Sequence, residues 1–142
     1  MSVLVRPFKK SDLKEIDPIE PLATNEMGDD EFTQAIEDSG LAVTGVRNGK
    51  VIGCGGVHPI DENQGEMWLR LDKDCLNHKI DTLWWLKCGM AIIEETYPFK
   101  QLNATVSCCF KESIKMIEWL GFIFTEEKMC DNKTWLIYSK RI

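Results

Sequence analysis

The chain has 142 residues, 44% of them hydrophobic, so it can bury one core but is too short for two domains of ordinary size. Its 17 basic and 23 acidic residues give a net charge of −6, which argues against a nucleic-acid backbone or an anionic membrane as the main partner. No apolar run reaches membrane-spanning length, and the first residues lack the pattern of a signal peptide. We therefore expect one soluble, cytoplasmic domain over residues 1–142.

The first third of the chain is predicted to hold one strand and two helices. Residues 3–6 form a short strand that Pro7 stops, and Ser11 is a suitable N-cap for the first helix. A second helix is expected from residue 29 or 30 to a C-terminal cap at Gly40. Two helices thus separate the first strand from the rest.

The strongest hairpin signal follows. The pair Asn48-Gly49 separates two β-prone stretches, residues 41–47 and 50–57. Asn-Gly suits the positive φ angles of a type I′ turn, whose twist matches that of antiparallel strands. We expect a tight hairpin here.

A strand over residues 66–71, a polar connection over 72–79 and a long helix ending near Tyr97 form the centre of the chain. Where a strand feeds a helix in this way, anionic ligands commonly bind, because the first helical N–H groups are unpaired and the helix dipole is positive there. We expect the function to reside in this stretch.

The long helix carries a broad apolar stripe that is typical of a helix packed on a sheet. The stripe consists of Ile80, Leu83, Trp84, Leu86, Met90, Ala91, Ile93 and Tyr97. On this phase Trp85 falls on the opposite, polar face with Asp81, Thr82, Gly89 and Thr96. An indole there either folds over its neighbours or contacts a protein partner or a second copy of the chain, since aromatic residues are enriched at interfaces.

The last third is predicted to contain a strand, a helix and two more strands. The strand covers residues 102–106, and the helix runs from Phe110 to Leu120 before Gly121 closes it. Residues 122–124 and 134–138 finish the chain as two strands around a turn.

The six cysteines lack the spacing of a disulfide framework or a zinc site. A metal site could be assembled from Cys75, His78, Cys108 and Cys109, but adjacent cysteines suit tetrahedral ligation poorly, and we predict no metal. A nucleophilic cysteine with a histidine base has no local signature either.

The element order, β-α-α-β-β-β-α-β-α-β-β, resembles that of the GNAT family, the acyl-coenzyme A N-acyltransferases. Local matches agree: Val5-Arg6-Pro7 followed by Ser11-Asp12-Leu13 looks like the opening strand and helix, the Asn48-Gly49 hairpin like the second and third strands, and Leu120-Gly121-Phe122 like the end of the last helix. The resemblance implies an α+β fold with a mixed, mostly antiparallel sheet of about six to seven strands and about four flanking helices.

The resemblance also implies an acetyl-CoA site on the central strand and the loop after it. In the family this strand pairs with the pantetheine arm, and a glycine-containing loop wraps the pyrophosphate. Carried over, the cofactor-binding residues are Leu69, Arg70, Leu71, Asn77, His78, Lys79, Ile80, Asp81, Thr82 and Ser113. The chain departs from the pattern because Lys79 and Asp81 replace the glycines, and three aspartates against two lysines leave one net negative charge over residues 72–81.

For catalysis, the resemblance points to Glu66 as general base, since several family members take the proton from the attacking amine with a glutamate on this strand. His58, at the end of the third strand, could do the same work. At the family's proton-donor positions this chain has Phe110 and Ile117, which cannot donate, so Tyr138 and Ser113 are the substitutes.

Two functions follow from the resemblance. The first is an acetyl-CoA-dependent N-acetyltransferase that acts on a primary amine of a small molecule or a protein. The alternative is a non-catalytic GNAT-like bacteriophage protein, an internal virion component or a binder of a host protein, located in the host cytoplasm or the virion. The second reading rests on the short length, the glycine-free loop, the Trp68–Leu71 strand and the Phe124-Thr125-Glu126-Glu127 ending.

Overall fold

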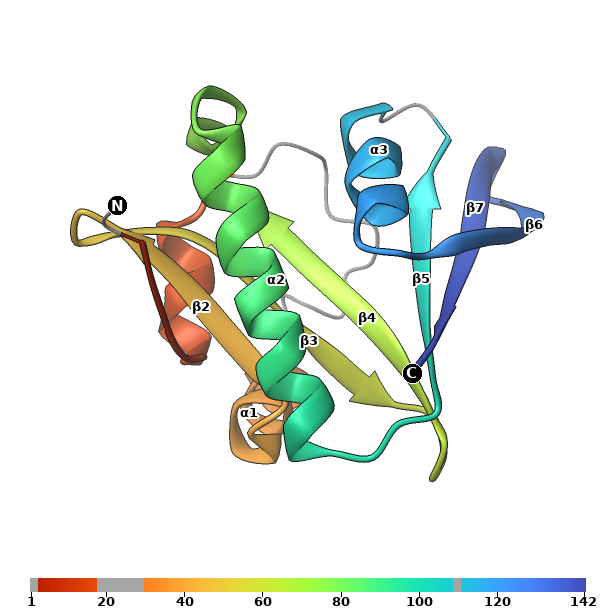
Figure 1. Cartoon of the computed structure of the whole chain (residues 1–142), viewed down its shortest axis with the longest axis horizontal. Coiled ribbons are helices and arrows are strands. Elements are labelled where there is room, and N and C mark those ends of the chain that lie inside the picture. The colour runs from red at the N-terminus through yellow and green to blue at the C-terminus, as the bar shows by residue number, and fades with distance from the viewer. Residues whose placement is uncertain (1–2, 18–29, 109–110) are drawn as a thin grey trace. The chain divides into compact units, whose positions relative to one another are not determined.

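The structure, a computed structural model, describes residues 3–17, 30–108 and 111–142 (Figure 1). Their helices and strands follow the predicted order. The elements are β1 (Val3–Pro7), the 3-10 helix η1 (Lys10–Glu15), α1 (Asp30–Ser39), β2 (Ala42–Arg47), β3 (Lys50–Pro59), β4 (Gln64–Leu71), the 3-10 helix η3 (Lys73–Asn77), α2 (Lys79–Thr96), β5 (Gln101–Ser107), α3 (Lys111–Trp119), β6 (Ile123–Cys130) and β7 (Lys133–Arg141).

The seven strands form one mixed sheet in the order β1-β2-β3-β4-β5-β7-β6. Pairing is antiparallel between β1, β2 and β3 and between β5, β7 and β6, whereas β4 and β5 are parallel. The predicted α+β fold class is confirmed. The residues group into two compact units, one of Met1–Val57 with Trp68–Tyr97 and one of His58–Met67 with Pro98–Ile142. That all 142 residues act as one domain stays a prediction.

In the first unit, one face of strands β2 and β3 is covered by the N-terminal segments. Its core contains the buried residues Phe8, Ile36, Ala42, Val51 and Cys54. Side chains of η1 and α1 pack against this cluster, and so does Trp68 of β4, whose ring meets that of Phe8 edge-on at 5.4 Å. Burial of such side chains is the main source of the unit's stability.

The other face of these strands is covered by α2 (Figure 1). The helix buries Thr82, Trp85, Leu86, Gly89 and Ile93. The predicted phase is therefore correct at Leu86 and Ile93 but wrong at Trp85, which is 1% exposed. Correspondingly, three members of the predicted stripe are exposed: Ile80, Trp84 and Ala91.

Glycines explain this phase. The backbone positions of Gly45 and Gly53, on β2 and β3, lie so close to the Trp85 ring that an added Cβ would come within 2.6 Å of it at either position. Gly89 similarly brings α2 against Val43. Because protein interiors are closely packed, the large Trp85 ring can face the sheet only where the opposing residues have no side chain, and here those residues are glycines.

The hairpin prediction is confirmed. Asn48 and Gly49 join β2 to β3 with φ angles of 51° and 80°, the left-handed values that a type I′ turn requires. Gly40 has a φ of 71° and follows α1 directly, as a C-terminal cap does. These local signals needed no tertiary information.

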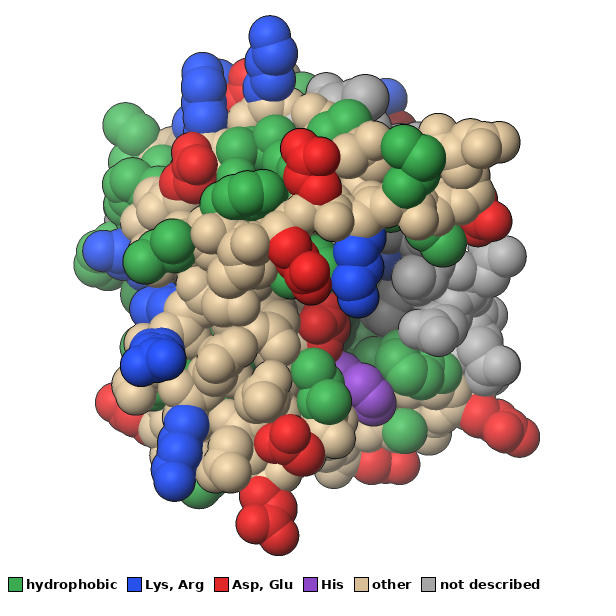
Figure 2. All heavy atoms as spheres, turned by 90° about the vertical axis from the view of Figure 1, so that its right-hand side faces the viewer, with side chains coloured by type: hydrophobic (Ala, Val, Ile, Leu, Met, Phe, Trp, Pro, Cys, Tyr) green, Lys and Arg blue, Asp and Glu red, His purple; other side chains and the backbone are tan. Residues whose placement is uncertain are grey.

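The second unit is built on β5, β7 and β6. The buried side chains of this unit include Leu102, Ala104 and Tyr138 on the strands and Ile117 and Leu120 in and after α3. All eight residues of β6, the last strand of the sheet, are exposed. Figure 2 shows this side of the molecule, where hydrophobic and acidic side chains lie next to one another.

Two sequence predictions fall on or near residues that the structure leaves out. The predicted helix start at Phe110 lies outside the described residues, and α3 is described from Lys111. Cys109, one of the four conceivable metal ligands in the sequence, also lies outside the described residues. Across the described ranges, none of the helices is long and apolar enough to span a membrane.

Candidate functional site

The ladder between β4 and β5 is short. In the described residues it covers four pairs, from Gln64 opposite Gln101 to Met67 opposite Ala104, and it ends there. The remaining part of β4, Trp68–Leu71, belongs to the first unit, where it runs beside Gly53 and Gly55 of β3. The ladder therefore ends at Met67, within the strand on which the sequence predicts the candidate site.

Glu66 lies one residue before that point. Its Oε1 accepts a hydrogen bond of 3.1 Å from the hydroxyl of Thr105 on β5. Burial raises the pKa of the Glu66 carboxyl, while the hydrogen bond from Thr105 and the charges of His58 and Lys128 oppose that rise and only reduce it. Two residues predicted as alternative bases, Glu66 and His58, thus lie in one unit, and the charge of His58 favours the carboxylate of Glu66.

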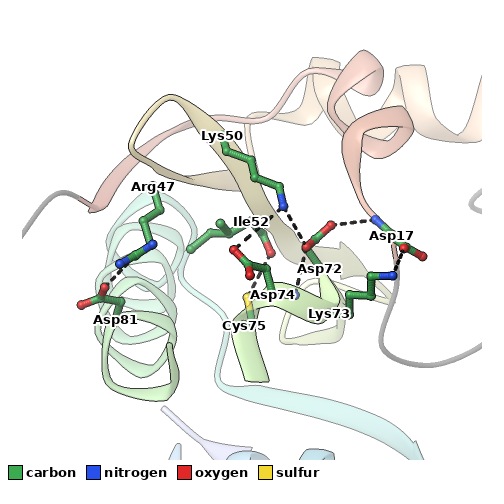
Figure 3. Close-up of polar contacts among 9 residues, drawn as sticks. All are labelled: Asp17, Arg47, Lys50, Ile52, Asp72, Lys73, Asp74, Cys75 and Asp81. Atoms are coloured by element: carbon green, nitrogen blue, oxygen red, sulfur yellow. Dashed lines mark hydrogen bonds and ion pairs between the residues drawn. The ribbon is translucent and has the colours of Figure 1, made fainter. Parts of the chain in front are cut away.

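Asp72, which follows β4, organises the connection to α2 (Figure 3). The residue is 2% exposed, and its carboxylate accepts hydrogen bonds from the backbone N–H groups of Asp17 at 2.8 Å and Asp74 at 3.0 Å. The Lys50 ammonium lies 3.4 Å from it. Burial alone would raise the pKa of Asp72, but these hydrogen bonds and Lys50 outweigh it, and the pKa is lowered.

Further contacts hold the same connection in place. The N–H of Asp72 donates to the carbonyl of Ile52 at 2.9 Å, and the thiol of Cys75 donates to that carbonyl at 3.1 Å. The Lys73 ammonium lies 2.7 Å from the carboxylate of Asp17. The loop is therefore a short 3-10 helix tied to β3 and to the end of the N-terminal segment, and not an open glycine turn.

Helix α2 begins directly after this 3-10 helix. His78 is its N-cap residue and makes no side-chain capping hydrogen bond. The hydroxyl and the N–H of Thr82 both donate to the carbonyl of His78, at 2.9 Å and 3.0 Å. The carboxylate of Asp81 does not turn back onto the helix; it accepts a 2.9 Å hydrogen bond from Arg47 at the end of β2 (Figure 3).

The electrostatics of the loop differ from what its own sequence suggests. Lys50 and Arg47, on the two sides of the β2–β3 turn, each face a loop aspartate, so two cations join the charges that were counted along residues 72–81. Lys50 also lies 3.9 Å from Asp74. The net negative charge predicted for residues 72–81 is therefore offset by Arg47 and Lys50. Sequence reasoning missed both cations because they lie more than twenty residues away.

The remaining predicted site residues are distributed over both units. Leu69, Arg70 and Leu71 are on the part of β4 in the first unit, where Arg70 donates to the carbonyl of Leu69 at 2.8 Å. Asn77 ends η3, His78 lies between η3 and α2, and Lys79, Ile80, Asp81 and Thr82 form the first turn of α2. Ser113 is in the first turn of α3, in the second unit.

Tyr138 is on β7 and is 3% exposed. Its hydroxyl donates to the carboxylate of Glu118 on α3 at 3.5 Å. Burial, and then the neighbouring Glu118, raise the pKa of the phenol, so it keeps its proton at neutral pH. Tyr138, in the second unit, is therefore a protonated phenol at neutral pH.

The prediction of a protein contact through Trp85 is wrong, because that indole is buried between α2 and strands β2 and β3. The large exposed apolar side chains in the described part of the helix are others: Ile80 is 81% exposed, Trp84 53% and Ile92 44%. They recur at steps of four and eight residues and form one stripe along α2, the α2 stripe. The sequence signal that distinguishes the two tryptophans is the set of glycines in β2 and β3.

Comparison with known proteins identifies the fold. No protein-family model and no curated protein sequence matches the chain. Among solved structures, 271 chains match, and the fold is that of the GNAT acetyltransferases.

Three of these structures illustrate the match. Ard1 from Thermoplasma volcanium gives a TM-score of 0.79 at 10% identity, over 100% of this chain and 99% of that one. The ribosomal-protein-alanine N-acetyltransferase of Brucella melitensis gives 0.74 at 16% identity, over 98% and 99%. A GNAT superfamily phosphinothricin acetyltransferase from Sinorhizobium meliloti, solved in complex with AcCoA, gives 0.70 at 17% identity, over 100% and 89%. The GNAT fold expected from the sequence is confirmed.

Proposed function

We propose that the protein is an acetyl-CoA-dependent N-acetyltransferase that transfers an acetyl group to a primary amine. One observation supports this most strongly: in a chain with the GNAT fold, the ladder between β4 and β5 ends at Met67, next to the half-buried carboxylate of Glu66. A strand that leaves its neighbour has backbone groups available for a ligand, and the carboxylate beside it can accept a proton.

The residues at the start of α2 fit the phosphate part of the coenzyme. The side chain of His78, the N-cap residue, makes no capping hydrogen bond. The carboxylate of Asp81 is bound by Arg47 and not by the first turn of the helix. An uncapped helix start favours an anion through its N–H groups and its dipole. In this proposal Leu69, Arg70 and Leu71 hold the pantetheine arm, and residues 77–82 hold the phosphates.

The reaction needs a base and an acid from the protein. Acetyl-CoA, when bound, supplies the acetyl group as a thioester. Glu66 in its carboxylate form takes a proton from the amine nitrogen, with His58 as the alternative base. Tyr138, whose phenol stays protonated, is the proton donor to the leaving sulfur.

Calorimetric titration with acetyl-CoA tests the coenzyme step. We expect saturable heat in the wild-type protein and weaker binding in Lys79→Glu, which adds a negative charge beside the phosphates. Glu94→Lys, at the far end of the same helix, is the control and should bind as the wild type does. Absence of heat at millimolar coenzyme would rule out the transferase.

A second function, that of a non-catalytic binding protein on the same fold, is favoured by the α2 stripe. Several large exposed apolar side chains on one side of a helix are typical of protein interfaces. The resemblance to bacteriophage GNAT-like proteins, internal virion components or binders of host proteins, agrees with this role. Loss of co-purification of a partner in Trp84→Ala, with no binding of acetyl-CoA by the wild type, would favour it over the enzyme.

A further inference from the structure

The side chains of β4 and β5 are linked by a repeated diagonal pattern within the second unit. The side-chain amide of Asn103 donates to Oε1 of Gln64 at 3.3 Å, and the hydroxyl of Thr105 donates to Oε1 of Glu66 at 3.1 Å. In the ladder, however, Gln64 is opposite Gln101 and Glu66 is opposite Asn103. Gln64 and Glu66 are thus each bound by the residue of β5 that lies two positions beyond the pairing partner.

The link between Thr105 and Glu66 is the later of these two links along β4. Beyond it, the ladder between the two strands has only the pair of Met67 and Ala104 left before it ends. A diagonal cross-strand contact restricts the rotamer of both side chains. It therefore restricts the side chain of Glu66 close to the end of the ladder, and it engages only one of the two carboxylate oxygens, Oε1.

We propose that Thr105 is a positioning residue that sets the orientation and the proton affinity of Glu66. This inference deepens the proposed transferase and rests on it for its functional meaning, but its structural content can be tested without catalysis. A hydroxyl that donates to a carboxylate stabilises the charged form, which is the form that a general base requires.

Other groups act on Glu66 as well. The charges of His58 on β3 and Lys128 on β6 also act on its carboxyl, and both favour the carboxylate. Burial acts in the opposite direction. The hydrogen bond from Thr105 is the largest of the effects that counter burial, so its removal should be visible in a titration.

The experiment is a carbon-13 NMR titration of glutamate carboxyls in the full chain, with the Glu66 signal assigned through Glu66→Gln. We expect Thr105→Val, which keeps the shape and removes the hydroxyl, to raise the pKa of Glu66 by roughly one unit, the effect of losing one hydrogen bond to a charged group. Thr105→Ser should restore the wild-type value. Thr125→Val is the matched control, because the Thr125 hydroxyl donates to the carbonyl of Ile137 at 2.9 Å and not to a carboxylate.

The outcomes separate the two proposals. An unchanged pKa of Glu66 in Thr105→Val, or an equal rise in Thr125→Val, overturns the role of Thr105. A rise in Thr105→Val alone that Thr105→Ser reverses supports it. If acetyl transfer is measured in parallel, Thr105→Val should move the acidic limb of its pH profile upward by the same amount, and a limb that does not move overturns the link to catalysis.

Discussion

The indole ring of Trp85 occupies the space in which any residue other than glycine at position 45 would place its Cβ. That atom would lie 2.6 Å from Cδ2 of the ring, closer than real Cβ contacts come. On β3, a Cβ at Gly53 would lie 2.6 Å from Cζ2 of the same ring. The packing of α2 on the first unit therefore depends on one large side chain and two positions that have none.

Trp85→Ala should destabilise the protein severely. Emptying the space of a buried indole costs about 3–5 kcal/mol, whereas Trp84→Ala, at an exposed position of the same helix, should change stability by about 0.5 kcal/mol or less. Urea denaturation followed by circular dichroism measures both. Equal losses in the two variants would contradict the helix phase that the structure has.

The same relationship can be tested from the side of the sheet. Gly45→Ala should cost roughly 1–3 kcal/mol, because the added methyl group meets a ring that cannot turn away in a packed core. Combined with Trp85→Leu, which removes the ring, Gly45→Ala should cost less than it does alone. A double-mutant cycle measures this coupling, and simple additivity of the two changes would argue against direct contact.

The helix phase also shows what the sequence could predict and what it could not. The turn at Asn48-Gly49 and the cap at Gly40 are local, because the residue types themselves favour the backbone angles that the structure has. The face that α2 buries is not local, since Ile80, Trp84 and Trp85 are all apolar and only the shape of the opposing sheet decides among them. Gly45 and Gly53 determine which face of α2 is buried, but this could be predicted only with the register of β2 and β3, which places the two glycines opposite one another.

The candidate site follows the same division. That a strand over residues 66–71 precedes a polar loop and a helix was predictable from composition and periodicity. The cations Arg47 and Lys50 and the donor Thr105 were not, because each contacts a residue that is far from it in the sequence. Such contacts between distant residues can be identified only when the fold is known.

Asp72 should make stability depend on pH. Its pKa is lowered in the folded protein from an ordinary value of 3.8, so it contributes stability above that value, and the contribution is lost as the pH falls through the folded pKa. Asp72→Asn should lower the free energy of unfolding by about 1–2 kcal/mol at neutral pH, with a smaller difference from wild type below about pH 4. Denaturation curves across this range measure it.

Two comparisons sharpen that prediction. The Asp72→Asn variant should still lose stability in acid, because the pKa of buried Asp12 is lowered as well, against burial, by hydrogen bonds from Arg6 and Thr44. Asp74→Asn serves as the control, since its partly exposed ion pair with Lys50 at 3.9 Å contributes little. A constant difference between Asp72→Asn and wild type at all pH values would show that the charge of Asp72 is not what stabilises the loop.

Glu66→Gln should separate stability from activity. Because burial raises the pKa of Glu66, the folded state disfavours its charged form, and an uncharged glutamine should leave thermal stability at neutral pH unchanged or raise it. If Glu66 is the general base, the same change should lower the rate of acetyl transfer by about 100-fold or more. Thermal unfolding and a transfer assay on one preparation measure both, and a variant that loses stability would point to a structural role.

Tyr138→Phe tests the proposed proton donor. The phenol is buried and its hydroxyl bond to Glu118 is long, at 3.5 Å, so removing the oxygen should cost little stability, of order 1 kcal/mol or less. The ring itself packs edge-on against Phe124 at 5.8 Å, and phenylalanine keeps that contact. A transferase that relies on Tyr138 should lose the basic limb of its pH profile in this variant, because that limb reports the acid that must stay protonated. Retention of the limb, with a folded and stable variant, would assign the proton to another group.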